Sequence, residues 1–308
     1  MSNRLSVTGV GTAVVDYIGV VEHYPGPDTQ IELQTFSKQP GGNVATAMVT
    51  LARLGADATF LGKFGDDELG RLVQAGLTEN GVDLTRSLIE AGGSMGFAFI
   101  IVEAGSGRRT ILWTGEGKSH LAADEVNREA ILASRYLHLD HYSIDAAIAA
   151  AQIAREGGVQ VVLDAEAQHP GIDKLLPLVD VLIACADFAC DYTGSSNCEE
   201  ALAKLFDTTA AHTVAITAGE QGSYCKTAAE THWQPAFPVE VVDTTGCGDV
   251  YHGAFIYGLL QEWPVARIAE FASAAAALNC LGLGGQSAIP DLAEVEAFLA
   301  SSKQKHQQ

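Results

Sequence analysis

Basic residues are scarce in this sequence. Lysine and arginine together number 18, against 38 aspartates and glutamates, so the formal net charge is −20. A surface of this charge repels the phosphate backbone of nucleic acids and anionic lipid headgroups. The composition therefore argues against a nucleic-acid or membrane-surface role. An anionic substrate would need a local positive patch or helix N-termini to bind.

Long apolar runs and paired cysteines are also absent from the sequence. No apolar segment approaches the roughly 20 residues of a membrane-spanning helix, and the N-terminus lacks the apolar core of a signal peptide. The six cysteines form no C-x-x-C pair and show no ligand-like spacing with histidine. We therefore expect reduced thiols and a cytoplasmic location, with neither a disulfide framework nor a zinc site.

Strand-like and helix-like segments alternate through most of the chain. The apolar segment 5–10 is typical of a buried strand, and the alanine-rich segment 43–54 is typical of a helix, which Gly55 ends. Such alternation predicts an α/β fold with a mostly parallel central sheet and helices on both faces. Further strands are expected at 58–62, 136–139, 159–163, 181–184 and 213–217, and further helices at 66–80, 144–156, 248–260 and 265–281.

Two stretches break this alternation. Residues 18–36 and 96–113 contain β-type residues and turn signals but no helical pattern. Antiparallel strands that project from the main sheet explain both stretches. We therefore expect one domain, residues 1–308, with a small β-sheet lid over the carboxyl ends of the parallel strands. Exposed lid strands favour pairing with a second copy of the chain, so a homodimer is expected.

The most informative segment is DTTGCGD at residues 243–249, where an apolar strand leads into a tight turn and then into a helix. Gly246 and Gly248 let the backbone approach a ligand, and the first amide N–H groups of a helix have no partner within it. With the helix dipole, these groups form an anion site suited to a phosphoryl group. Acids in a first helical turn are common without any catalytic task. At the rim of an anion site, however, Asp249 could take a proton from an attacking hydroxyl, as phosphoryl transfer requires.

The full string closely resembles the C-terminal signature of the PfkB/ribokinase family of carbohydrate kinases, which usually reads DTTGAGD; Cys247 replaces the usual alanine. The resemblance implies a ribokinase-like fold and ATP-dependent transfer of a phosphoryl group to a sugar hydroxyl. Asp249 would be the catalytic base, and the backbone of Gly246, Cys247 and Gly248 would form the anion hole. Mg²⁺ would accompany ATP, and a requirement for a monovalent cation such as K⁺ is left open.

The same resemblance implies substrate contacts near the N-terminus. GGNVA at residues 41–45 looks like the family's N-terminal glycine signature, so Gly42 and Asn43 would contact sugar hydroxyls. Asp16 would accept hydrogen bonds from the same substrate. The physical properties agree, because glycine permits close approach and an amide side chain both donates and accepts hydrogen bonds. At a helix start, Asn43 is also compatible with a simple N-cap.

A second group of residues is implied on the nucleotide side. TAGEQG at residues 217–222 resembles the family's T-x-G-x-x-G, which approaches ATP, and a late helix face would line the adenine pocket. The ordinary alternative for that helix is alanine-rich packing. The residues that the resemblance assigns to ATP are Thr217, Gly219, Gly222, Ala276, Asn279 and Cys280.

A narrower resemblance, to the ketohexokinase branch, favours a ketose-like acceptor. It is carried by YPGPD at 24–28, RTI at 109–111, VLDAE at 162–166 and GLGG at 282–285. By this resemblance Asp28 would reach the sugar of a neighbouring subunit. Arg109 would approach the sugar or a phosphate, although an arginine in solvent explains that residue equally well.

One departure from the family pattern concerns the metal. Many members carry N-x-x-E where this chain reads CADFA at 185–189, so the expected glutamate is missing and only Asp187 is near. We therefore assign no metal ligand. The departure leaves open a sugar- or nucleotide-binding sensor with little turnover, and a nucleoside kinase is a further alternative. Asp140, in HLDH at 138–141, follows a predicted strand and is expected in the substrate wall as a sugar contact.

Overall fold

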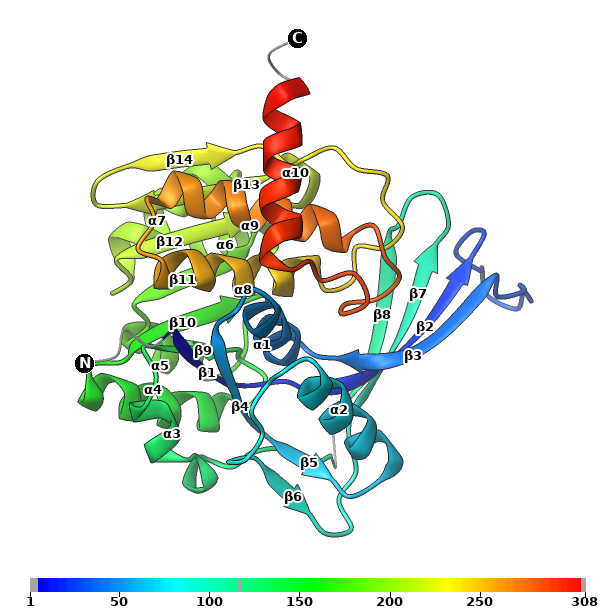
Figure 1. Cartoon of the computed structure of the whole chain (residues 1–308), viewed down its shortest axis with the longest axis horizontal. Coiled ribbons are helices and arrows are strands. Elements are labelled where there is room, and N and C mark those ends of the chain that lie inside the picture. Colours follow the sequence, from blue (N-terminus) through cyan, green and yellow to red (C-terminus); the bar gives the residue numbers. More distant parts are fainter. Residues whose placement is uncertain (1–4, 116–117, 306–308) are drawn as a thin grey trace.

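The computed structural model describes residues 5–115 and 118–305, so the predicted domain limits, residues 1 and 308, lie outside the described residues. An eight-stranded sheet forms the centre of the molecule (Figure 1). Its strands pair in parallel from β12 to β4, whereas β13 and β14 pair antiparallel at one edge. In spatial order the strands are β14 (Thr231–Gln234), β13 (Ser223–Thr227), β12 (Thr213–Thr217), β11 (Val181–Cys185), β10 (Gln160–Ala165), β9 (Tyr136–Leu139), β1 (Ser6–Val10) and β4 (Asp57–Leu61).

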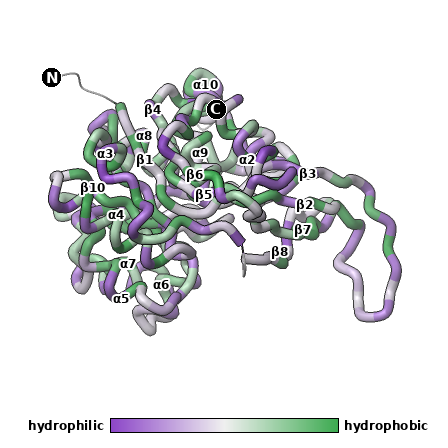
Figure 2. The backbone as a smooth tube through the Cα atoms, turned by 90° about the horizontal axis from the view of Figure 1, so that it is seen from below, coloured by the Kyte–Doolittle hydropathy of each residue, from purple (hydrophilic) through white to green (hydrophobic). Residues whose placement is uncertain are grey.

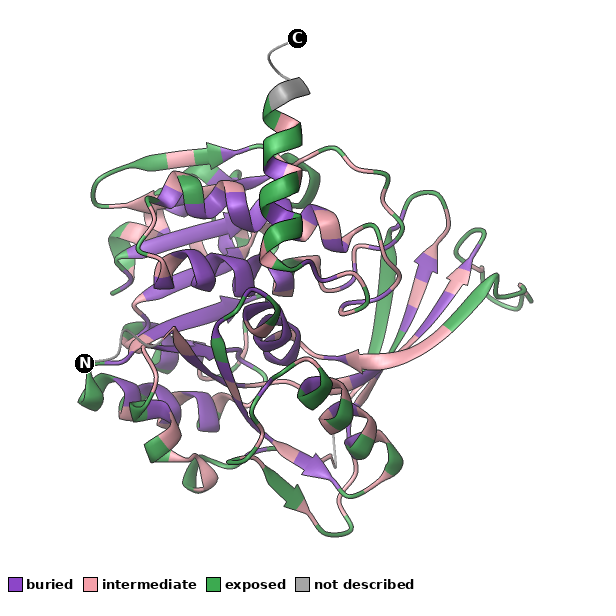
Figure 3. Ribbon diagram, in the orientation of Figure 1, coloured by how far each residue is buried: buried purple, intermediate pink, exposed green. Residues whose placement is uncertain are grey.

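Helices cover both faces of this central sheet, which confirms the predicted α/β architecture (Figure 3). Along β10, Val162 packs into one apolar core while Val161 and Leu163 pack into the other, because successive side chains of a strand point to opposite faces. The first core includes α1 (Asn43–Arg53), α2 (Glu68–Glu79), α8 (Cys247–Leu260), α9 (Val265–Asn279) and α10 (Leu292–Lys305). The second includes α3 (Arg128–Leu132), α4 (Ile144–Gly157), α5 (Ile172–Leu175), α6 (Ala186–Thr193) and α7 (Cys198–Thr208).

A four-stranded sheet, called the lid sheet below, stands beside the central sheet (Figure 1). Its order is β3 (Thr35–Gly41), β2 (Val14–Val21), β7 (Phe97–Glu103) and β8 (Arg109–Thr114). Strands β2 and β7 pair in parallel, and the two outer pairs are antiparallel. The second predicted stretch, 96–113, corresponds to the β7–β8 hairpin.

The first predicted lid stretch, 18–36, differs from the structure in its interior. Residues 22–34 form no strand and extend away from the molecule as a long loop between β2 and β3 (Figure 2). Pro25 and Pro27 have no amide N–H to give to a sheet ladder, and Asp28 adopts a positive φ of 58°. The strands therefore lie on either side of the proline-containing turn rather than through it.

Smaller elements complete the chain. A two-stranded sheet pairs β5 (Lys63–Gly65) with β6 (Leu88–Glu90), and the short 3₁₀ helices are η1 (Ala123–Glu125), η2 (Leu176–Leu178) and η3 (Gly219–Gln221). Within residues 5–115 and 118–305, no helix has the length and apolar character that a bilayer crossing needs. The carboxyl ends of parallel β1, β9 and β10 lie at one edge of the central sheet, next to the lid sheet, and this edge positions the candidate site.

Candidate active site

The turn that leads into α8 is held by a buried aspartate and a required glycine. One carboxylate oxygen of Asp243 accepts hydrogen bonds from the amide and the hydroxyl of Thr245, at 2.9 and 2.8 Å. The other accepts from the amide of Gly284 at 2.8 Å. Gly246 has a φ of 73°, and a β-carbon there would lie 2.5 Å from the Cα of Gly285. Only glycine fits this position without moving the neighbouring loop.

Amide groups at the start of α8 point away from the protein's own acceptors. The N–H of Cys247 donates to the carbonyl of Thr244 at 3.3 Å, but no atom in the described part of the chain accepts from the N–H of Gly246, Gly248 or Asp249. A β-carbon on Gly248 would meet nothing within 4 Å, so this amide borders open space. The helix start thus offers N–H groups and the positive end of its dipole to an anion.

A cavity of about 600 Å³ lies between the central sheet and the lid sheet. Its walls come from the carboxyl ends of β1, β9 and β10, from three lid strands and from the start of α8. The structure therefore brings together predicted residues from distant parts of the sequence. Those that line the cavity are Asp16, Gly42, Asn43, Arg109, Gly246, Gly248 and Asp249.

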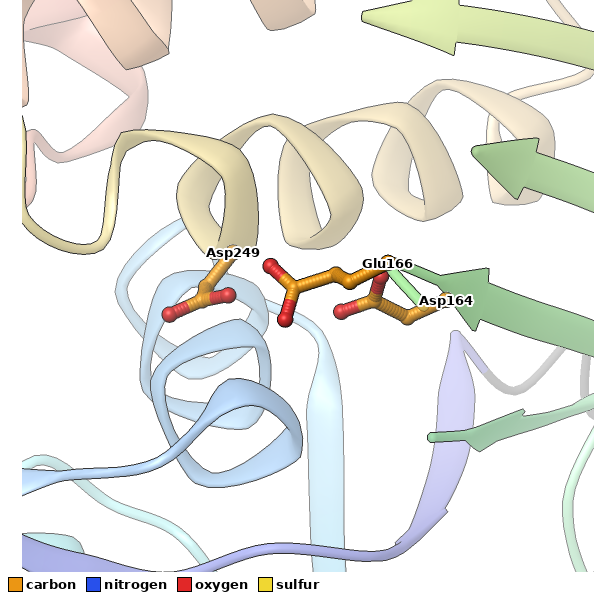
Figure 4. A group of neighbouring side chains, drawn as sticks. All are labelled: Asp164, Glu166 and Asp249. Atoms are coloured by element: carbon orange, nitrogen blue, oxygen red, sulfur yellow. The ribbon is translucent and has the colours of Figure 1, made fainter. Parts of the chain in front are cut away.

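Three carboxylates converge at this cavity, and two of them, Glu166 and Asp249, line it. Asp164 lies on β10, Glu166 follows it directly, and Asp249 lies in the first turn of α8, with oxygen atoms within 4.8 Å of one another. Figure 4 shows the side chain of Glu166 extending from the end of β10 toward the carboxylate of Asp249 at the start of α8. Burial, and next the charge of Glu166, raises the pKa of both Asp164 and Asp249 well above the ordinary range. Mutual repulsion between these groups means that a bound cation would be stabilised here.

The donor set fits the magnesium ion that the family resemblance implies. Mg²⁺ prefers oxygen ligands, and carboxylate oxygens are the usual protein donors. Sequence reasoning assigned no metal ligand, although the signal was present in VLDAE. An Asp and a Glu two positions apart point to the same side of a strand, and this pair ends at the edge where ligands of α/β sheets bind. Asp187 is exposed on α6 and is not part of the cluster.

Asp164 also connects three elements of the fold. The Nδ2 of Asn43, at the start of α1, donates to Asp164 Oδ2 at 3.2 Å, and the Nε2 of His252 on α8 lies 3.4 Å from Oδ1. Both Asp164 and His252 are buried. Burial lowers the pKa of His252 well below its ordinary value, and that of neighbouring His138 to about 4, so both imidazoles are neutral near pH 7. Asp164 thereby orients a residue predicted to contact the sugar.

The lid sheet contributes an acidic residue, Asp16, and a positively charged residue, Arg109, to the cavity. Asp16 on β2 is only 5 % exposed, and burial, followed by the charge of Asp243, raises the pKa of Asp16 to about 7. The Nη1 of Arg109 on β8 donates to the hydroxyl of Thr244 at 2.8 Å. That hydroxyl in turn donates to the carbonyl of Gly107 at 3.1 Å. The β7–β8 hairpin is therefore joined directly to the turn before α8.

Two predicted substrate residues lie outside the cavity lining. Asp28 is exposed in the loop 22–34, away from the cavity of its own chain. Asp140 is buried, and its carboxylate accepts from the amides of Thr12 at 2.6 Å and Tyr142 at 3.1 Å. Asp140 thus holds two loops that line the cavity, and its predicted contact with a sugar stays a prediction.

The residues assigned to ATP lie beyond the cavity wall, and their role in nucleotide binding stays a prediction. Asn279 is fully buried, and its amide donates to the carbonyl of Thr245 at 3.2 Å, so it supports the turn from behind. A β-carbon on Gly222 would collide with the carbonyl oxygen of Gln234, which explains this glycine by packing alone. The remaining members are Thr217 at the end of β12, Gly219 in η3, Ala276 on α9 and Cys280, which caps α9.

Comparison with known proteins agrees with the geometry of the site. Residues 4–292 match the sequence model of the pfkB family carbohydrate kinases. The chain belongs to this family. The kinase is 30 % identical over 303 residues to the ribokinase of Haemophilus influenzae, a match that covers 96 % of this chain and 99 % of that one. It is 28 % identical over 320 residues to fructokinase-1 of Zea mays, covering 96 % and 97 % of the two chains.

Solved structures show the same fold. An E. coli protein described provisionally as ribokinase II, in complex with ATP and Mg²⁺, superposes on the kinase with a TM-score of 0.85. The match covers 96 % of this chain and 99 % of that one at 23 % identity. The predicted ribokinase-like fold and the predicted family are both confirmed.

Proposed function

We propose that this kinase transfers the γ-phosphoryl group of ATP to a hydroxyl of a small sugar or sugar derivative, with a ketose-like acceptor favoured. The observation that carries the proposal is the position of Asp249. Its carboxylate lines the cavity, beside the amides of Gly246 and Gly248, which have no acceptor in the described chain. A proton acceptor and an anion site thus meet at one point, which is the arrangement that phosphoryl transfer needs.

In the proposed reaction, Asp16, Gly42 and Asn43 hold the hydroxyl groups of the acceptor in the cavity. Asp249 accepts the proton of the attacking hydroxyl. Burial and the charge of Glu166 raise the pKa of Asp249, and a raised pKa makes a carboxylate a stronger base toward an alcohol. The acceptor oxygen that has lost its proton would then attack the γ-phosphorus of ATP, with the γ-phosphate bound at the start of α8.

Negative charge on the transferred group would be stabilised by fixed groups of the protein. The amide N–H groups of Gly246 and Gly248 and the guanidinium of Arg109 surround the same end of the cavity. When bound, Mg²⁺ neutralises phosphate oxygens, and Asp164 and Glu166 are the residues that would hold it or its water ligands. A requirement for a monovalent cation such as K⁺ stays a prediction.

The alternatives receive less support from the site. A low-turnover sensor was motivated by the missing glutamate after β11, but Asp164 and Glu166 supply carboxylates from the neighbouring strand β10. The nucleoside-kinase alternative shares the same catalytic groups, and none of the described residues that line the cavity favours it specifically. An acceptor panel separates these alternatives.

Asp249→Asn tests the proposal. We expect kcat to fall by at least about 100-fold, because the amide cannot accept the proton, while ATP still binds. The measurement is ADP release with ketoses, aldoses, sugar phosphates, sulfonated sugars and nucleosides as acceptors. Asp187→Asn is the matched control, since Asp187 is exposed on α6 outside the cavity, and it should keep full turnover.

Near-normal turnover of Asp249→Asn would remove Asp249 from the role of base. If the unmodified protein bound ATP but released no ADP above background with any acceptor, the sensor alternative would replace the kinase proposal. Turnover restricted to nucleosides would favour the nucleoside kinase.

A further inference from the structure

Two thiols meet beside the anion site. Cys247 is the first residue of α8 and Cys280 caps the C-terminus of α9, and their Sγ atoms lie 2.7 Å apart. A disulfide bond is about 2.05 Å long. The two sulfur atoms therefore need to approach by only about 0.7 Å to become bonded. Both side chains are half-buried, so small reagents can reach them.

The backbone on either side of the thiol pair is already held together. The carbonyl of Cys280 accepts from the amide of Val242 at 2.8 Å, and the side chain of Asn279 donates to the carbonyl of Thr245 at 3.2 Å. The end of α9 and the turn before α8 thus lie side by side. Bond formation needs a small movement of the turn before α8 and of the end of α9, and no separation of these elements.

We infer that Cys247 and Cys280 form an oxidative modification site, at which a hydroperoxide converts the two thiols to a disulfide that slows the kinase. The bond itself follows from the thiol geometry. The effect on turnover rests on the proposed function, because it assumes that the start of α8 receives the phosphoryl group.

The two sulfur atoms share one hydrogen bond in which either thiol can be the donor. The reaction can therefore start at either thiol, and ionisation gives the thiolate, the reactive form. When it starts at Cys280, the thiolate of this residue attacks the O–O bond of the hydroperoxide, which breaks to give a sulfenic acid and an alcohol or water. The Cys247 sulfur then attacks the sulfenic sulfur, and water leaves. Two thiols lose two electrons and two protons in total, and one hydroperoxide is reduced.

No other pair of described thiols lies beside the anion site, although Cys190 on α6 and Cys198 on α7 interact with each other. Cys225 is fully buried, and burial raises its pKa to about 12, so its thiol is protonated and shielded. Cys190 is half-buried on α6, away from the active site. The pair Cys247–Cys280 is thus the one placed to affect the turn that receives the phosphoryl group.

The bond would disturb the anion site directly. Cys247 stands between Gly246 and Gly248, whose amides are available to a ligand. A shift of about 0.7 Å at this residue would tilt the neighbouring amides, and misplacement by about 1 Å can reduce a reaction rate by about 100-fold. We therefore expect the oxidised enzyme to lose at least about tenfold in kcat.

The test treats the full-length protein with excess hydrogen peroxide and follows two readouts. Mass spectrometry of a proteolytic digest should show the peptides of Cys247 and Cys280 joined with loss of two hydrogens. The kcat of the same sample should fall at least about tenfold and return after dithiothreitol. Cys280→Ser and Cys247→Ala should show no cross-link and no thiol-reversible loss relative to their own reduced activity. Cys190→Ser is the matched control and should keep both the Cys247–Cys280 cross-link and the thiol-reversible loss of kcat.

Each outcome decides the inference. Failure of the Cys247 and Cys280 peptides to join, while other thiols are oxidised, would overturn the modification site. A complete cross-link with unchanged kcat would overturn its effect on turnover. The mass readout does not depend on kinase activity, so an inactive protein that still forms the bond would count against the proposed function and in favour of the thiol site.

Discussion

At the scale of single residues, the cavity concentrates acids whose pKa values depend on burial. Asp16 has no hydrogen-bond partner among the described side chains and faces the cavity from the lid sheet, 5 % exposed. Its pKa rises from 3.8 to about 7, mainly through burial. A buried carboxylate without protein donors is expected where a ligand supplies the donors, and sugar hydroxyls are such donors.

The raised pKa of Asp16 also predicts that this residue lowers the free energy of unfolding at high pH. Between about pH 4 and 7 the folded protein binds more protons at Asp16 than the unfolded chain does, so this residue destabilises the fold progressively as pH rises through that window. Asp16→Asn should therefore raise the free energy of unfolding, relative to the unmodified protein, by about 1–4 kcal/mol more at pH 8 than at about pH 4. Denaturant unfolding at both pH values measures this difference. An equal effect of the substitution at both pH values would contradict it.

At the scale of elements, the start of α8 contains two glycines, Gly246 and Gly248, that are needed for different structural reasons. Gly246 is required by its positive φ and by its contact with Gly285, whereas a β-carbon on Gly248 would enter open space. One glycine thus permits the turn to form, and the other keeps the approach to the amides clear. A string of small residues in the sequence does not reveal this division.

Alanine at each glycine should separate folding from function. Gly246→Ala should destabilise the protein by at least about 1–2 kcal/mol, the cost of a left-handed conformation. Gly248→Ala should leave the stability equal or improve it by about 0.5–1 kcal/mol, as for a helical Gly→Ala change. Its methyl group would nevertheless obstruct the anion site, so kcat should fall at least about tenfold. Thermal unfolding and ADP release of both variants provide the comparison. A fully active Gly248→Ala enzyme would show that no ligand approaches this amide.

Sequence reasoning succeeded where the chemistry is carried by a short contiguous pattern. The alternation of apolar strands and helices predicted the central sheet, and DTTGCGD predicted the turn and the helix start. Convergence of residues distant in the sequence was harder to predict. The meeting of Glu166 with Asp249 depends on how β10 and α8 pack. Asp140 illustrates a second difficulty, because a carboxylate after a strand can face either the cavity or backbone amides, and here it accepts from Thr12.

At the scale of the whole molecule, the lid sheet exposes large apolar side chains on the face opposite the cavity. Phe99 and Leu112 are direct cross-strand partners and are 41 % and 53 % exposed, and Phe36 is 55 % exposed. The loop 22–34 extends beyond this sheet and carries Asp28 away from the cavity of its own chain. Both features support the proposed homodimer through the lid, in which Asp28 would contact the sugar bound by the neighbouring subunit.

Light scattering at micromolar concentration measures the oligomeric state. We expect a dimer mass for the unmodified protein and a monomer mass for Leu112→Asp, because a charge would be buried in the lid interface. Ile89→Asp is the matched control, since Ile89 is 62 % exposed on β6 outside the lid sheet, and this variant should remain dimeric. A monomer mass for the unmodified protein would contradict the proposal.

The contact between Arg109 and Thr244 joins the lid sheet to the turn before α8 and has a consequence for how charge is distributed. Asp164, Glu166 and Asp249 belong to β10 and α8, while the guanidinium whose charge acts on Asp249 comes from the lid sheet. Displacing the lid would take that counter-charge away from Asp249, and the amides at the start of α8 would then remain to attract an incoming triphosphate. The position of the lid and the electrostatic field inside the cavity would therefore change together, and added salt would screen that field.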